Sequence, residues 1–352
     1  MKRSFLAYGL PLLFSGLLSL AGLPAATAQN ITDAGAYMGY ISGQYREILK
    51  DYVGYSSAVA HGKNARKIEN RRQELIRTTN DARRKITAMP PFEGDKSFRD
   101  STAKFLLISY HLLNDDYGKI VNLEEVAEQS YDAMEAYLMA QQLANEKLDQ
   151  AKARLDATEK AFAGKNNVRL LETKDDLARK AEKTTQINSY YHPLYLIFFK
   201  SYKQEMYLLD AVQKKNVNAV EQNKNTLVKY AEAGLGQLDT LPGMYGDRSV
   251  VNACRQLLEF YRDECRQQMP ALTGFYLKEE NFTKIQQAMT AKRGRTQADI
   301  DQYNRAADEM NQAGNAFNRT NGQLFESRKK LLDNWNKTVA AFFDKHVPKY
   351  KE

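Results

Sequence analysis

Histidine and cysteine, the residues that most often bind metals or act as nucleophiles, are scarce in this chain of 352 residues. Its four histidines form no Glu-x-x-His pair, no His-Glu-x-x-His motif and no haem attachment motif. A phosphate-binding loop and a serine nucleophile elbow are also missing from the sequence. We therefore expect no metal site, no cofactor and no enzymatic activity. The histidines, interpreted as turn or surface residues, are His61, His111, His192 and His346.

Carboxylates are abundant, but the sequence brings no pair of them together. The 43 aspartates and glutamates are scattered among opposite charges. On predicted helices, such mixed charge is typical of exposed faces. No acid and base pair is therefore nominated, and a hydrolase built from carboxylates distant in sequence is only a third hypothesis.

The two cysteines, Cys254 and Cys265, lie eleven residues apart in one predicted helix. Eleven steps of about 100° bring them to nearly the same face, but a rise of 1.5 Å per residue separates them by roughly 16 Å. A disulfide requires Cα atoms within about 7 Å, so the two cannot pair with each other. Both fit an apolar series with Val251, Leu258 and Tyr261, which predicts small buried hydrophobes. A disulfide between two chains is the alternative.

A long hydrophobic run occurs only near the amino terminus. Two basic residues precede the apolar run 5–23, and small residues follow it at 26–28. This order predicts a secretory signal over residues 1–28, cleaved after its last residue. The alternative is an uncleaved anchor, but Gly9 and Pro11 leave an apolar core shorter than the roughly 18 to 20 residues that a spanning helix needs. We expect an exported protein, in the periplasm or at the cell surface.

The remainder of the chain predicts neither a membrane span nor a strongly charged protein. No later hydrophobic run is long enough to cross a bilayer. Removal of Lys2 and Arg3 with the signal lowers the formal charge from +8 to +6. So mild an excess gives little support for an acidic partner, and no nucleic-acid partner is expected.

Apolar residues recur at spacings of three and four along most of the chain, which is typical of helices with one buried seam. In the first part we expect helices over 33–59, 64–88 and 123–162, with another helix carrying the apolar positions of 105–120. Short turns between long helices imply antiparallel neighbours, and hence an up-down four-helix bundle over residues 29–167.

A connector helix and a second four-helix bundle are predicted over residues 168–352. The connector is the charged stretch that opens this unit, and His192-Pro193 should separate it from the next helix, because proline lacks the amide that a continuing helix needs. The remaining helices are predicted over 216–241, 247–269 and 297–345, with an interruption at Pro270 and Gly274.

Two short stretches, MPPFEGDKS at 89–97 and LPGMYGDRS at 241–249, match at an offset of 152 residues. Their common spacing indicates an internal repeat, so the predicted fold class is all-α with two tandem, internally duplicated up-down four-helix bundles. We expect the shared residues to stop one helix and cap the next. A bound anion or cation is the alternative. The shared residues are Pro90, Gly94, Asp95 and Ser97 in the first stretch and Pro242, Gly246, Asp247 and Ser249 in the second.

The second predicted helix of the first unit is conspicuously basic. Its cations suit an anionic lipid, a lipopolysaccharide or another acidic polymer, or they form an ordinary solvated face. The corresponding helix of the second unit has lost most of this charge, so a function shared by both units cannot depend on it. The charged residues are Arg66, Lys67, Arg71, Arg72, Arg77, Arg83, Arg84 and Lys85 against Glu69, Glu74 and Asp81.

Tyrosine is abundant, with 21 residues, and its densest cluster lies beside the predicted break at His192. Tyrosine fills a core while its hydroxyl still needs a partner, so it suits both bundle interiors and binding surfaces. Tyr190, Tyr191, His192 and Tyr195 are the candidate patch for a ligand or partner, with core packing as the alternative.

The combination of a signal peptide, a duplicated helical unit and no catalytic motif resembles uncharacterised helical envelope and surface proteins of Gram-negative bacteria. This resemblance is one of architecture and composition, so it carries over no functional residues. The duplicated bundle is also similar to that of imelysin-like periplasmic proteins. Their His-x-x-Glu signature is missing, because His61, His111 and His192 are followed three places later by Asn64, Asn114 and Tyr195.

These features favour a non-enzymatic exported protein that binds another envelope component or macromolecule, either an envelope protein or an anionic polymer. That hypothesis predicts dry bundles with no buried cluster of ionisable residues. The alternative is a small-ligand or metal binder with a pocket inside or between the bundles. It requires a cavity lined by tyrosines and at least two converging carboxylates or histidines.

Overall fold

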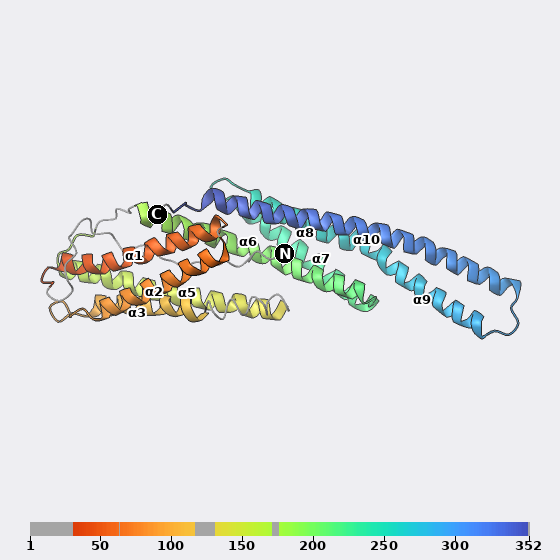
Figure 1. The fold of residues 1–352 in the computed structure, drawn as a ribbon, viewed down its shortest axis with the longest axis horizontal. Coiled ribbons are helices and arrows are strands. Elements are labelled where there is room, and N and C mark those ends of the chain that lie inside the picture. Colours follow the sequence, from red (N-terminus) through yellow and green to blue (C-terminus); the bar gives the residue numbers. More distant parts are fainter. Residues whose placement is uncertain (1–30, 63, 117–130, 171–175, 351–352) are drawn as a thin grey trace. The chain divides into compact units, whose positions relative to one another are not determined.

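The computed structural model of the chain is predominantly helical in the part that it describes (Figure 1). This confirms the all-α class for those residues, where extended pairing is confined to isolated bridges. Among the described residues, no helix combines the length and the apolar character that crossing a bilayer demands. The predicted signal at 1–28 lies outside the described part, as does the predicted start of a helix at Leu123. The described residues are 31–62, 64–116, 131–170 and 176–350.

Long α-helices and two short π-helices make up this part of the chain, and most agree closely with the predicted ranges. The α-helices are α1 (Ala34–Ala60), α2 (Ala65–Thr87), α3 (Ser97–His111), α5 (Tyr131–Lys165), α6 (Asp176–Gln213), α7 (Val217–Thr240), α8 (Ser249–Asp263), α9 (Met269–Ala291) and α10 (Gln297–His346). The π-helices are η2 (Leu112–Asp116), after α3, and η3 (Glu264–Gln268), after α8.

The chain divides into two compact units, and the division does not fall at the predicted boundary of residue 167. Of the described residues, those up to 192 and those from 340 to 350 form unit 1, and residues 193–339 form unit 2. The first half of α6 belongs to unit 1 because it packs there: the Tyr52 and Thr185 hydroxyls lie 3.3 Å apart. The boundary between the units falls inside two continuous helices, α6 and α10. No break in the hydrophobic pattern of the sequence marks it.

The predicted separation at His192-Pro193 is wrong, because α6 continues through Pro193. A proline inside a helix removes one backbone hydrogen bond and costs about 3 kcal/mol. Buried neighbours on both sides offset this cost, since Tyr191 is 2 % exposed and Leu194 is fully buried. From Asp176 on, the predicted connector is thus the start of α6 and not a separate helix.

The core of unit 1 is built on α1, α2, α3 and α5, which contact one another in chain order (Figure 1). Phe162 of α5 lies at its centre. The Phe162 ring centroid lies 5.6 Å from that of Tyr37, 5.5 Å from Phe92 and 5.5 Å from Phe98. These four rings come from α1, the turn after α2, α3 and α5, and they form one aromatic cluster.

The core of unit 2 is centred on Trp335 of α10, which is fully buried. Its ring stacks on Phe198 of α6 with the centroids 4.5 Å apart. The Tyr276 hydroxyl of α9 donates a hydrogen bond of 2.7 Å to the Val212 carbonyl. Both buried cysteines are free thiols in this core, as expected from their apolar series.

The predicted interruption at Pro270 and Gly274 is also wrong, because α9 begins at Met269 and includes both residues. Proline clashes with the carbonyl four residues earlier in a regular helix, but here the wider π-helix η3 comes directly before it. Pro270 lies in the first turn of α9, where proline is well tolerated.

The two matching turns adopt the same backbone conformation. In the first, Phe92 and Asp95 exchange backbone hydrogen bonds of 2.9 and 2.8 Å, and the φ angles of Glu93 and Gly94 are 49° and 81°. Met244 and Asp247 exchange bonds of 3.0 and 2.9 Å around the second turn. Its central residues have φ angles of 49° and 79°. Two successive positive φ values define a type I′ turn, which explains the glycine in each copy.

Each turn also caps the helix that follows it. The Asp95 carboxylate accepts a hydrogen bond of 2.9 Å from the Ser97 amide, and the Asp247 carboxylate accepts one of 2.9 Å from the Ser249 amide. Hydrogen bonds from the Ser97 side chain and backbone, together with Lys165, lower the pKa of Asp95 to about 2. The repeated residues therefore make the contacts that a helix needs to stop, turn and begin again.

Candidate functional site

The outer side of α2 carries a set of exposed cations that the sequence analysis had singled out. Steps of about 100° per residue place Arg66, Arg77 and Arg84 within about 20° of one another around the helix. Lys67 and Lys85 form a second row beside them. All five side chains are exposed, and together they are called the cationic face. Arg66 and Arg84 are separated by roughly 27 Å along the helix.

The other cations of α2 are held by neighbouring groups, which distinguishes them from the cationic face. Arg71 pairs with Glu74 at 3.1 Å and Arg72 with Glu69 at 2.8 Å. Arg72 also donates to the Leu113 carbonyl at 3.1 Å. Arg83 donates to the Asn80 side chain at 3.0 Å. Within the described part of the chain, the side chains of the cationic face make no ion pair or hydrogen bond.

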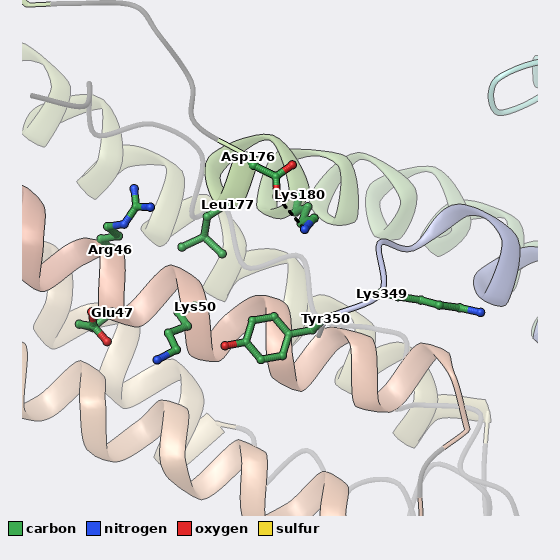
Figure 2. Close-up of a pocket in the computed structure, with 8 residues that line it drawn as sticks. All are labelled: Arg46, Glu47, Lys50, Asp176, Leu177, Lys180, Lys349 and Tyr350. Atoms are coloured by element: carbon green, nitrogen blue, oxygen red, sulfur yellow. Dashed lines mark ion pairs between the residues drawn. The ribbon is translucent and has the colours of Figure 1, made fainter. Parts of the chain in front are cut away.

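A hollow of about 520 Å³ lies in unit 1, and Figure 2 shows its lining side chains around Tyr350. The Tyr350 amide donates to the Ser57 hydroxyl at 2.9 Å, which fixes this end of the chain against α1. One ion pair, Lys180 to Asp176 at 2.7 Å, crosses part of the lining and lowers the pKa of Asp176. The lining comprises Arg46, Glu47, Lys50, Asp176, Leu177, Lys180, Lys349 and Tyr350.

A second hollow of about 410 Å³ includes part of the cationic face, since Arg66 and Lys67 line it together with Asn64, Asn70, Arg71 and Glu74. The Arg71 guanidinium lies over the Tyr350 ring, 6.0 Å from its centroid. Arg71 and Tyr350 thus each line one of the two hollows and contact each other. In the lining of each hollow the cations outnumber the carboxylates.

The tyrosine cluster of α6 is engaged in ring packing. Tyr191 meets Phe343 edge to face at 4.9 Å, and Tyr190 lies 6.0 Å from Phe342. Tyr195 is 6 % exposed and contacts Phe199 at 5.7 Å. His192 is partly buried, and burial lowers its pKa. These positions correspond to the core-packing alternative for the cluster.

The histidines are dispersed in the structure as they are in the sequence. His61 Nδ1 lies 2.7 Å from an Asp344 carboxylate oxygen, and His346 packs on Phe342 at 4.7 Å. His346 is 7 % exposed, so its interpretation as a turn or surface residue is wrong. No group of three or more histidine, cysteine, aspartate or glutamate side chains able to hold a metal ion occurs among the described residues.

A cluster of three charged residues lies inside unit 2, and the sequence analysis missed it. Arg328 of α10 donates through Nε to Glu205 of α6 and through a terminal nitrogen to Glu264 of η3 at 2.5 Å. The Glu205 and Glu264 side chains are 1 % and 0 % exposed, and that of Arg328 is 12 % exposed. Three helices therefore bring two carboxyl groups to one guanidinium in the core, and we call this group the Glu–Arg–Glu cluster.

This cluster contradicts the expectation of a dry interior without buried ionisable residues. It also supplies the converging carboxylates that the ligand-binding alternative required, but the arginine lies against both of them. The sequence signal was position: Glu205 lies seven residues after Phe198 and three before Leu208, and Glu264 lies three residues after Tyr261, and all three of these neighbours are buried. Treating every carboxylate as exposed concealed both residues.

No protein-family model, curated protein or solved structure matches this chain.

Proposed function

We propose that this chain is an exported, non-enzymatic protein that binds an extended anionic polymer through the cationic face of α2. The observation that carries the proposal is the set of five exposed cations without an intramolecular partner in the described structure. Glu69 and Glu74, which are spaced to reach Arg66 and Arg77, pair instead with Arg72 and Arg71. The exposed Asp81 is the remaining carboxylate of α2 near the cationic face.

The spacing of the cationic face favours a polymer over a small anion. Arg66, Arg77 and Arg84 form a row roughly 27 Å long, so a compact ligand could not contact all three of them. A chain with regularly spaced sulfate, phosphate or carboxylate groups could contact all three at once. Arginine suits this role because its planar guanidinium can bind an oxyanion with two hydrogen bonds.

Unit 2 offers an internal comparison for this surface. At the offset of 152 residues, Arg66, Arg77 and Arg84 correspond to Asn218, Lys229 and Gly236 of α7. Only one cation of the row is therefore present there. The proposed binding function belongs to unit 1 alone.

Substitution of Arg66, Arg77 and Arg84 by glutamine should weaken binding to immobilised dextran sulfate roughly 10- to 100-fold, with unchanged melting. Biosensor measurements over a range of salt concentrations would test this, with neutral dextran as the reference. Each exposed charge contributes modestly and is screened by salt, so binding should also weaken as salt is added. The matched control replaces three exposed arginines of unit 2, Arg293, Arg305 and Arg319, by glutamine and so removes the same net charge.

An equal loss of affinity in both triple variants would show a non-specific effect of net charge and would contradict the proposal. Failure of the unmutated protein to bind dextran sulfate would also contradict it. Binding to vesicles of anionic phospholipid but not to the polymer would replace it with a lipid-surface function.

We also infer that export depends on the amino-terminal sequence. The basic residues, the apolar run 5–23 and the small residues at 26–28 support a cleaved signal, followed by residence in the periplasm or at the cell surface. Amino-terminal sequencing of protein from its natural host should begin at Gln29. A first residue within the apolar run or before it would exclude cleavage there.

We further propose that units 1 and 2 contain two copies of one helical unit, each derived from an up-down four-helix bundle. The matching features support this: Asn64 and Asn216 each cap a helix, type I′ turns follow at the same offset, and 15-residue helices lead into π-helices η2 and η3. Each of these pairs lies 152 positions apart.

Equivalent turns should respond equally to substitution. Gly94→Ala and Gly246→Ala should each lower the free energy of unfolding by about 1–2 kcal/mol, because alanine is strained at φ near 80°. Gly236→Ala, in open space on α7, is the control and should stabilise the helix by about 0.5–1 kcal/mol. Thermal melting followed by circular dichroism would measure all three variants. Unchanged melting in either turn variant would argue against a common structural role for the two turns.

A further inference from the structure

We infer that the Glu–Arg–Glu cluster is a proton-binding site in the core of unit 2, at which Glu205 and Glu264 share one proton while Arg328 balances the remaining negative charge. The site is separate from the cationic face and does not depend on the polymer-binding proposal. Its ligand is a hydrogen ion, and its occupancy would make the stability of unit 2 depend on pH.

Charge balance is the first argument for the site. One guanidinium contacts both carboxyl groups, so two ionised carboxylates would leave a net negative charge in the core. Burial of an uncompensated charge is costly, and a carboxyl group avoids the cost by keeping its proton. With one proton bound, the cluster holds a single carboxylate opposite a single guanidinium.

Hydrogen bonding is the second argument. Both carboxyl groups accept from the same Arg328 guanidinium, and two carboxyl groups gathered at one donor can hydrogen-bond to each other only when one of them carries a proton. Glu264 Oε2 is buried and accepts no hydrogen bond from another described residue. A bare carboxylate would be poorly satisfied in this position, whereas a protonated carboxyl group can donate to Glu205.

Burial and neighbouring charges also favour the protonated form of the pair. Burial, the charge of Glu205 and the hydrogen bond to Glu205 raise the pKa of Glu264 to about 8, despite the opposing effect of Arg328. Burial also raises the pKa of Glu205. The pair therefore releases its shared proton at neutral to mildly alkaline pH, far above the range of an exposed glutamate.

Other titratable groups around the cluster keep their charge state over this range. Tyr261 of α8 and Cys265 of η3 face the carboxyl groups, and burial raises the pKa of each, so both stay neutral. Tyr202 of α6 acts on Tyr261, and Lys224 of α7 acts as a cation on Cys265. Burial opposes the charge on Arg328, but the neighbouring Glu205 and Glu264 carboxylates raise its pKa overall, so it remains charged. The titration is thus confined to the two glutamates.

The sign of the pH effect follows from these shifts. In the unfolded chain, Glu264 has an ordinary pKa near 4.5, and in the folded chain its pKa is about 8. The stabilising contribution of the bound proton is therefore complete below about pH 4.5 and is lost as pH rises through about 8. Unit 2 should melt at progressively lower temperature across this interval.

Comparison of Glu264→Gln with the unmutated protein would test the site, because glutamine imitates the protonated carboxyl and leaves Glu205 paired with Arg328. Between pH 5.5 and pH 9 the melting temperature of the unmutated protein should fall by roughly 5 °C more than that of the variant. Glu326→Gln, an exposed carboxylate on α10, is the matched control and should keep the unmutated pH profile. Parallel profiles for all three proteins would overturn the proposal.

A second measurement covers the outcome in which Glu264→Gln does not fold. Carbon-13 spectroscopy of the unmutated protein, labelled at glutamate side chains, should show one or two carboxyl signals titrating above pH 6. Signals that all titrate below pH 5 would overturn the proposal, whatever the behaviour of the variant.

Discussion

Replacement of Arg328 by methionine should lower the free energy of unfolding by about 3–5 kcal/mol at pH 9 and by less than about 2 kcal/mol at pH 5. Removal of one partner from a buried charge cluster leaves the other charges uncompensated. Both glutamates would then bind protons in the folded state, and their pKa values would rise further above those of the unfolded chain. The resulting penalty is absent at low pH and grows as pH rises.

Urea unfolding followed by circular dichroism at both pH values would measure this difference. Arg319→Met serves as the control, because Arg319 lies on the same helix with its side chain exposed, and its effect should stay within about 0.5 kcal/mol. An equal loss for Arg328→Met at pH 5 and pH 9 would mean that the arginine acts through packing alone. That result would also contradict the proposed charge balance between Arg328 and the two glutamates.

Replacement of Phe162 by alanine should lower the free energy of unfolding by about 3–5 kcal/mol, the cost of emptying a large aromatic site in a packed core. Phe162 is 2 % exposed and contacts Tyr37, Phe92 and Phe98 at centroid separations of 5.5–5.6 Å. One substitution therefore removes three ring contacts, each of which contributes about 0.5–1.5 kcal/mol beyond its buried area. The first type I′ turn should loosen as well, because Phe92 forms one side of its bridge.

Thermal and urea unfolding would measure the effect, and amide hydrogen exchange at residues 92–95 would detect the loosened turn. Phe325→Ala is the control, because Phe325 is 58 % exposed on α10 and its loss should change stability little. A loss below about 1 kcal/mol for Phe162→Ala would show that the surrounding side chains collapse into the space. The cluster would then not be the centre of unit 1.

Helix positions were predictable because the physical signals lay within a few residues of each other. Asn64 and Asn216 cap helices with their side chains, and an apolar period runs through α1. Proline misled the prediction at Pro193 and Pro270. In each case a buried seam or an adjacent π-helix tolerates the missing amide, and both of those are properties of the tertiary structure.

The candidate sites also differ in how far the sequence predicts them. The charge of α2 was visible in the sequence, but the distinction between paired Arg71 and unpaired Arg77 required side-chain geometry. Glu205, Glu264 and Arg328 lie 59 or more residues apart in the chain. Their convergence depends on how α6, η3 and α10 pack, and no local pattern specifies that.

The position of Trp335 gives the two units different optical properties. It is the one tryptophan in the chain, and it is fully buried against Phe198 in unit 2. Its fluorescence, excited where tyrosine does not absorb, therefore reports the core of unit 2, whereas the far-ultraviolet dichroism sums both units. A denaturation experiment that records the two signals together separates the collapse of one unit from that of the whole chain without any added label.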